Sequence, residues 1–148
     1  MSFTGSYQLM STQKWMNWFV YMQNNSEGNV RGWKGDPGNQ GHWNITKIGS
    51  TNKYLLSPKE WPNRYLYMQD NSNGNVRGWQ GDPGPQGHWM ITQKGTVIVG
   101  GQSLPTYVFN PERWRNWYMY MQDNSKGNVR GWKGDPGIQG YFIIKQAP

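Results

Sequence analysis

Three tryptophans, each at the end of an Arg-Gly-Trp sequence, are the residues best suited to chemistry in this chain. Each is followed by a Gly-Asp-Pro-Gly turn and then by a glutamine. An exposed indole covers the apolar C–H face of a sugar ring, while amide, carboxylate and guanidinium groups bond to its hydroxyls. The sequence therefore predicts three equivalent ligand sites, with these candidates: Asn29, Arg31, Trp33, Asp36 and Gln40; Asn75, Arg77, Trp79, Asp82 and Gln86; Asn128, Arg130, Trp132, Asp135 and Gln139.

Each type of candidate also has a structural interpretation. Arg31 and its counterparts can pair with the nearby aspartate to brace the loop, and the glutamine amides can bind the turn backbone. These two alternatives stay open at the level of sequence. For the tryptophans a site is favoured, because Phe142 replaces Trp43 and Trp89 at a position that needs only a large apolar group. No such replacement occurs among the three Arg-Gly-Trp tryptophans.

An internal sequence repeat organises the secondary structure that must position these residues. The blocks 21–43, 67–89 and 120–142 align without gaps, and the second and third are identical at 18 of 23 positions. A weaker echo precedes each block and leads to Trp15, Trp61 and Trp114, which we expect in equivalent positions. Seven extra residues precede the third block, and we expect the segment 95–105 to be a lengthened surface loop.

Each repeat contains about four strand-like runs, which in the second repeat are 54–57, 65–69, 75–79 and 88–92. Helical periodicity is absent. Three units of four short strands suit an all-β fold, a β-trefoil, because three-fold closure protects the strand edges that one unit leaves open. A β-prism is the rival. We expect a single domain over 1–148, with repeats at about 5–48, 49–95 and 96–148.

Strand alternation assigns the residues to two faces. The inward face takes Val20 and Met22, Leu66 and Met68, Met119 and Met121, and the valines Val30, Val76 and Val129. The last strands are closed by Trp43, Trp89 and Phe142, which we also expect in the core. The outward face takes the Asn, Arg and Trp of each Asn-Val-Arg-Gly-Trp run, beside Phe19, Tyr21 and Gln23 of the paired strand and their counterparts.

Composition limits the classes of function. Cys is absent, which removes disulfides, thiolate catalysis and Cys-ligated metals. His42 and His88 become Tyr141 in the third repeat, so a shared metal or catalytic role for them is not expected, and we predict no cofactor. No apolar run of 18 residues exists, so no membrane insertion is expected. The start lacks a signal peptide, so we expect a cytoplasmic protein or one exported without a classical signal.

The segment Trp-Gln-Gly-Asp-Pro-Gly-Pro-Gln-Gly-His-Trp (79–89) resembles the end of a ricin-B-type β-trefoil lectin repeat, in its Cys-free fungal or invertebrate form. In that family an aromatic residue on the third strand precedes a Gly-Asp-Pro turn, and the repeat ends in Gln-x-Trp. In this chain the corresponding ending, Gln-Gly-His-Trp, is one residue longer. The resemblance implies a sugar site in each repeat that uses an acid or amide after the early strands, the stacking aromatic and the final amide. It adds Asn24, Asp70 and Asp123 to the candidates, with Asn24 departing from the Asp of the other repeats.

The sequence thus predicts a non-enzymatic lectin, an agglutinin with up to three sites, whose partners are glycans or glycoproteins. A net charge of +7 and interleaved Arg, Trp and Tyr make single-stranded nucleic-acid binding an alternative. The basic residues are spread over all repeats, which disfavours it. A protease inhibitor is a further alternative, with 95–105 as its one distinctive loop. The sequence names neither the sugar nor the oligomeric state.

Overall fold

A computed structural model of the chain describes residues 2–12, 17–23, 28–69, 74–122 and 127–148. Its strands follow the three repeats, four to each. The first repeat contains β1 (Ser6–Ser11), β2 (Trp18–Met22), β3 (Val30–Lys34) and β4 (Trp43–Lys47). The second contains β5 (Lys53–Pro58), β6 (Arg64–Met68), β7 (Val76–Gln80) and β8 (Trp89–Val99). The third contains β9 (Gln102–Pro111), β10 (Trp117–Met121), β11 (Val129–Lys133) and β12 (Phe142–Gln146).

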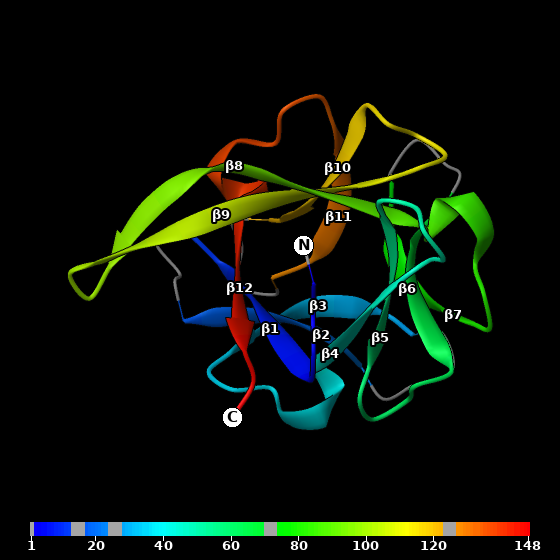
Figure 1. The fold of residues 1–148 in the computed structure, drawn as a ribbon, viewed down its shortest axis with the longest axis horizontal. Helices are drawn as coiled ribbons and strands as arrows, with labels where there is room; N and C mark the ends of the chain where they lie inside the picture. The colour runs from blue at the N-terminus through cyan, green and yellow to red at the C-terminus, as the bar shows by residue number, and fades with distance from the viewer. Residues whose placement is uncertain (1, 13–16, 24–27, 70–73, 123–126) are drawn as a thin grey trace.

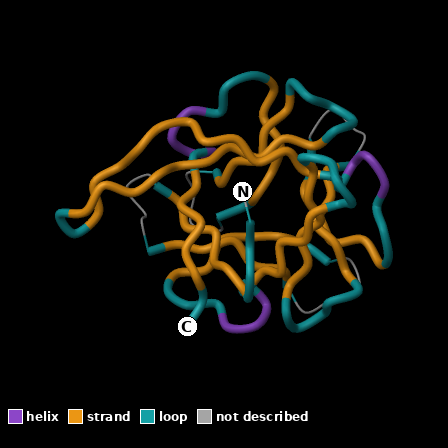
Figure 2. The backbone as a smooth tube through the Cα atoms, in the orientation of Figure 1, coloured by secondary structure: helices purple, strands orange, loops and turns teal. Residues whose placement is uncertain are grey.

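Six of these strands close into a barrel. The pairing runs β12-β9-β8-β5-β4-β1, and β1 pairs again with β12, so no barrel edge is left open. The other strands form three hairpins, β2–β3, β6–β7 and β10–β11, spaced around the barrel (Figures 1 and 2). A six-stranded barrel with three hairpins in three-fold arrangement is a β-trefoil, which confirms the fold class expected from the repeats.

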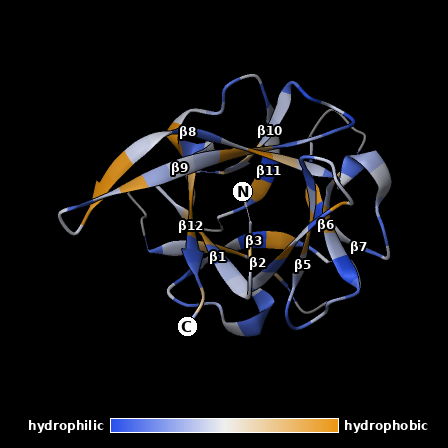
Figure 3. Ribbon diagram, in the orientation of Figure 1, coloured by the Kyte–Doolittle hydropathy of each residue, from blue (hydrophilic) through white to orange (hydrophobic). Residues whose placement is uncertain are grey.

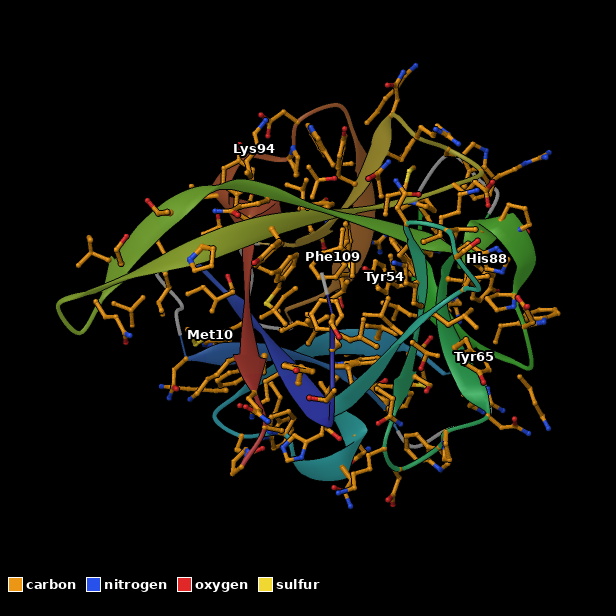
Figure 4. The ribbon with its side chains drawn as sticks, in the orientation of Figure 1. Met10, Tyr54, Tyr65, His88, Lys94 and Phe109 are labelled. Carbon is orange, nitrogen blue, oxygen red and sulfur yellow. The ribbon has the colours of Figure 1, made fainter. Side chains whose placement is uncertain are left out.

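The core is built from the inward residues that alternation selected. Trp43, Trp89 and Phe142 are fully buried, and each tryptophan donates its indole N–H to a carbonyl of the neighbouring hairpin, Val20 or Leu66. The valines and the second-strand pairs are buried with them. Figure 4 shows Phe109 and Tyr54 directed into the same interior. Of the equivalent tryptophans expected before each block, Trp61 and Trp114 both pack against this core, and Trp15 lies outside the described residues.

The hairpins are joined to one another through glycines. The Gly32 N–H donates to the Gly127 carbonyl of the third repeat at 2.7 Å, and the same bond recurs from each repeat to the previous one. A Cβ at Gly32 would lie 2.5 Å from the sulfur of Met121, so the core leaves no room for a side chain there. Gly28 has φ +63°, and a Cβ on it would meet the Gly78 backbone. Glycine is therefore required on both sides of each junction.

Two expectations were wrong for one shared reason. The extra residues of the third repeat are not a loop: they lengthen β8 and β9 into a paired ribbon that turns at Gly100-Gly101 and projects from the barrel (Figure 1). Hydrophobic residues continue along this ribbon (Figure 3), and its inner side packs on a second small core. Phe19, expected on the outward face, is buried there with Met10 and Ile143.

The short Gly-Asp-Pro-Gly loops end in single 3-10 turns, η1 (Gly38–Gln40), η2 (Gly84–Gln86) and η3 (Gly137–Gly140). Pro37 has φ −80° and Gly38 has φ +68°, as the Asp-Pro-Gly turn chemistry predicts. Across the described ranges, no helix has the length and apolar character needed to pass through a membrane.

Candidate functional site

The Arg-Gly-Trp tryptophans lie on the outer face of the hairpins. In β6–β7, Trp79 is opposite Tyr65 and Val76 is opposite Met68 (Figure 4 labels Tyr65). Because successive side chains of a strand point to opposite faces, burial of Val76 directs Trp79 outward. The side chains of Trp33, Trp79 and Trp132 are 50%, 52% and 53% exposed. The expected exposure is thus observed in all three repeats.

Two of these tryptophans line pockets of nearly equal size. The pocket at Trp79 has a volume of about 370 Å³, and the pocket at Trp132 about 360 Å³. Both volumes fall within the range of about 300–1,000 Å³ usual for small-molecule sites. The first is lined by Arg64, Tyr67, Gln69, Arg77, Gly78, Trp79 and Gln80, and the second by Trp117, Tyr120, Gln122, Arg130, Gly131, Trp132 and Lys133.

Each pocket is held rigid by a Tyr–Trp–Gln arrangement. The Tyr67 and Trp79 rings meet edge to face at 5.4 Å between centroids, and the Gln69 amide donates to the Tyr67 hydroxyl at 3.4 Å. The other two repeats have the same contacts. Sequence reasoning placed these tyrosines and glutamines on the outward face but did not choose them as site residues. Their identity in all three repeats was the available signal: Tyr21, Tyr67 and Tyr120; Gln23, Gln69 and Gln122.

The predicted aspartates serve their own loops. One carboxylate oxygen of Asp82 accepts the Gly84 N–H at 2.9 Å and lies 2.8 Å from Nε2 of His88. These bonds, the backbone bond first, hold the pKa of Asp82 below its ordinary value. Asp36 and Asp135 are held in the same way, by Gly38 and Gly137, and their pKa values are lowered too. Asp82 and Asp135 do not line the pockets at Trp79 and Trp132.

The residue that bonds to each loop aspartate differs between repeats, but its structural role is the same. The imidazole Nε2 of His42 and of His88, and the hydroxyl of Tyr141, each lie within 2.8 Å of the carboxylate. The bond to Asp135 raises the pKa of the Tyr141 hydroxyl, since the carboxylate disfavours a phenolate beside it. Figure 4 shows His88 at the edge of the molecule. The replacement of His by Tyr therefore preserves a loop brace.

In the first two repeats the predicted glutamines bind a backbone carbonyl, which belongs to a hairpin strand and not to their own turn. Gln40 donates its amide to the Met22 carbonyl at 3.2 Å, and Gln86 donates to the Met68 carbonyl at 3.2 Å. These bonds tie η1 and η2 to the ends of β2 and β6. Gln86 and Gln139 do not line the pockets at Trp79 and Trp132.

The predicted asparagines and arginines gather at the centre of the molecule. Arg31 donates to Asn128 and not to Asp36, so the structural alternative of an Arg–Asp brace is wrong. Arg77 donates to Asn29, and Arg130 donates to Asn75, which closes a ring across the three repeats. Arg77 and Arg130 also line the pockets at Trp79 and Trp132, so they connect the ring to the tryptophans.

A smaller pocket of about 180 Å³ lies between the second and third repeats. Lys94 lies 3.4 Å from the Asp135 carboxylate at its rim (Figure 4 labels Lys94). The remaining predicted residues, Asn24, Asp70 and Asp123, lie outside the described residues. Within the described part of the chain, no three His, Asp or Glu side chains lie close enough together to hold a metal ion.

Sequence comparison finds relatives that match about a quarter of this chain. Toxin CfTX-B of Chironex fleckeri is 50% identical over 40 residues, which are 27% of this chain and 9% of the toxin. Toxin CaTX-A of Carybdea alata is 40% identical over 42 residues, which are 28% of this chain and 9% of the toxin. Each match thus spans a small part of the toxin's length. No family model matches the chain.

Structure comparison covers the whole chain. A mosquitocidal holotoxin superposes with a TM-score of 0.82 at 15% identity, over 100% of this chain and 18% of the holotoxin chain. A Polyporus squamosus lectin bound to a sialylated epitope gives 0.75 at 15% identity, over 98% of this chain and 50% of the lectin. A Macrolepiota procera ricin-B-like lectin bound to lactose gives 0.72 at 13% identity, over 99% of this chain and 100% of the lectin. The fold is therefore that of the ricin-B-like β-trefoil lectins.

Proposed function

We propose that this chain is a carbohydrate-binding module with three equivalent sites, centred on Trp33, Trp79 and Trp132. The observation that carries the proposal is the half-exposed indole that recurs in every repeat and that lines, at Trp79 and Trp132, a pocket of sugar-binding size. A large aromatic exposed to water contributes little to folding. Its retention in three copies therefore favours contact with a ligand.

The chemistry of the pocket suits a pyranose. The indole supplies a flat apolar surface for the C–H face of the ring, and the edge-on tyrosine fixes its orientation. Around it stand groups that bond to hydroxyls: in the second repeat Gln69, Gln80 and the guanidiniums of Arg64 and Arg77. Guanidinium groups also pair with a carboxylate or sulfate, so acidic sugars are compatible. The loop Asp and Gln residues contribute indirectly, by holding the turn beside the hairpin.

Three sites on one rigid barrel support multivalent binding. A single shallow pocket holds a sugar weakly, and simultaneous engagement on a glycosylated surface raises the overall affinity through effective concentration. The sugar-bound lectins with the same fold support this proposal. The similarity to segments of much longer toxins supports a role as an attachment module, whether alone or within a larger protein.

We propose no catalytic role, no cofactor and no metal for this chain. The loop aspartates, whose pKa values are lowered, are held first by backbone N–H groups and then by a His or Tyr side chain of the same loop, so they are not poised as acid and base around a common substrate.

The test is a glycan array probed with the wild-type chain, with a variant carrying Trp33→Ala, Trp79→Ala and Trp132→Ala, and with Ile98→Ala as the matched control. Ile98 is 66% exposed on the ribbon, away from the pockets, so its replacement removes exposed apolar surface without touching a site. We expect binding by the wild type and the control, and none by the triple variant.

Two results would overturn the proposal. One is a triple variant that remains folded and binds glycans as the wild type does. The other is a blank array together with tight binding to single-stranded DNA that weakens steeply with salt, because counterion release dominates nucleic-acid binding. Sugar binding in the pockets should persist when salt is raised or a chelator is added.

A further inference from the structure

The ring of arginines and asparagines encloses a cavity on the three-fold axis. The Nη1 atoms of Arg31, Arg77 and Arg130 donate to the Oδ1 atoms of asparagines in the neighbouring repeats, at 2.6, 2.7 and 2.9 Å. The backbones of the same residues form three bridges that follow the same cycle. A cavity of about 160 Å³ lies inside, lined by three copies of Asn, Val and Arg: Asn29, Val30, Arg31, Asn75, Val76, Arg77, Asn128, Val129 and Arg130.

This arrangement concentrates positive charge. A guanidinium stays protonated in a protein, so three full positive charges line one small cavity. Among the described residues, Asp36, Asp82, Glu112 and Asp135 pair with histidines or lysines, and no carboxylate pairs with Arg31 or Arg130. The asparagine oxygens satisfy one N–H of each guanidinium but carry no charge. Like charges held together are unfavourable unless an anion joins them, and the net charge of +7 adds to that field.

The arginine side chains are also incompletely satisfied. The Nε atoms of Arg31 and Arg130 are buried and have no hydrogen-bond partner among the described residues. Buried donors usually have partners, and charged ones cost the most when they lack them. The guanidiniums of Arg31 and Arg130 are therefore each pinned by an asparagine and a backbone bridge, and no carboxylate of the described residues neutralises them. A rigid ring of this kind is preorganised, so binding an anion requires little reordering.

We propose that this cavity binds one tetrahedral oxyanion, a sulfate or phosphate group, on the three-fold axis. Such a group presents three equivalent oxygens around an axis, one toward each arginine, which matches the repeat of the donors. The cavity is too small for a sugar ring by comparison with the pockets at Trp79 and Trp132. The site differs from the sugar sites in number as well, one per chain against three.

The wild-type chain tests the proposal directly. Titration calorimetry with sodium sulfate and with inorganic phosphate, at constant ionic strength, should give saturable binding at one anion per chain. Planar nitrate at the same concentration serves as the anion control and should bind at least tenfold more weakly. Absence of saturable binding, a stoichiometry of three, or equal binding of nitrate would each overturn the proposal.

Variants separate the ring from general charge. Arg31→Gln removes a guanidinium but keeps an amide donor for Asn128, whereas Arg113→Gln removes the same charge from an exposed position outside the ring. Arg31→Gln should weaken sulfate binding at least tenfold, and Arg113→Gln should leave it unchanged. Equal effects of the two substitutions would show a nonspecific charge effect and overturn the site. If Arg31→Gln does not fold, the calorimetric stoichiometry of the wild type still decides.

Two further experiments identify the source of the anion and separate the anion site from the proposed sugar sites. Displacement of inorganic sulfate by a galactose sulfate ester, but not by galactose, would support the site and show that it accepts a glycan substituent. Failure of the ester to displace sulfate would support a site for the free ion. Trp79→Ala leaves the ring intact, so it should retain sulfate binding even where sugar binding is lost.

Discussion

Two tryptophans ten residues apart in the second repeat, Trp79 and Trp89, have opposite surroundings. Trp79 is half exposed and contacts Tyr67 across the outer face of its hairpin. Trp89 is fully buried and donates its indole N–H to the Leu66 carbonyl. Both recur in the first repeat, so recurrence alone does not distinguish a site residue from a core residue. The difference between them comes from the strand face and from what the barrel places against it.

The third repeat sharpens this comparison. There Phe142 replaces the buried tryptophan and remains fully buried, whereas Trp132 retains the exposed one. A core position needs volume and apolar surface, which several residues supply. A stacking position needs the wide indole face. The pattern of replacement therefore carries more information than the pattern of identity.

The substitution Trp89→Ala should have the largest effect, a loss of stability. Removing a fully buried indole leaves a cavity and an unpaired carbonyl, so the free energy of unfolding should fall by about 3–5 kcal/mol. Urea unfolding followed by circular dichroism measures this. Binding per folded molecule at the sites of the other repeats should persist, and a stability unchanged within about 0.5 kcal/mol would contradict the core assignment.

Trp79→Ala should give the converse result. Its side chain is exposed, so the melting temperature should change little, while affinity at that site should fall by about 1–3 kcal/mol, as for loss of aromatic stacking elsewhere. Calorimetry with the sugar identified on the array should show two sites where the wild type has three. A large fall in melting temperature with unchanged binding would place Trp79 in the core instead.

A smaller effect is expected from Trp89→Phe, which copies the third repeat. It keeps an aromatic in the core but removes the N–H bond to the Leu66 carbonyl, so it should cost about 1 kcal/mol of stability. Trp79→Phe is the matched control, since Trp79 is exposed, and should leave stability unchanged. Equal unfolding free energies for Trp89→Phe and the wild type would show that the indole bond contributes nothing.

The smallest expected effect is the loss of stability at acid pH. The pKa values of Asp36, Asp82 and Asp135 are lowered in the folded chain from the ordinary value of 3.8. Their contribution to stability is therefore complete above that value and is lost as the pH falls through the lower folded pKa. We expect a modest fall in melting temperature below about pH 4. Asp82→Asn should reduce that acid dependence, and an identical acid profile would argue against the loop brace.

The sequence by itself determined the architecture and most of the core. The three repeats fixed the number of units, and strand alternation correctly assigned Val76 to the interior and Trp79 to the surface. Both are local properties, because the direction of a side chain along a strand depends on its neighbours in the same strand. The turn chemistry of Asp-Pro-Gly was readable for the same reason. These signals needed no knowledge of how the repeats meet.

Only the tertiary structure decided which partners those residues find. The sequence left open whether Arg31 pairs with Asp36, five residues away, and the structure shows that it bonds to Asn128, in another repeat. Phe19 was expected at the surface, but Met10 and Ile143 of the barrel pack against it, beside the projecting ribbon. The physical reason is that closure of the barrel brings the three hairpins together around one axis. Contacts between residues 97 positions apart follow from that closure, and no local periodicity encodes them.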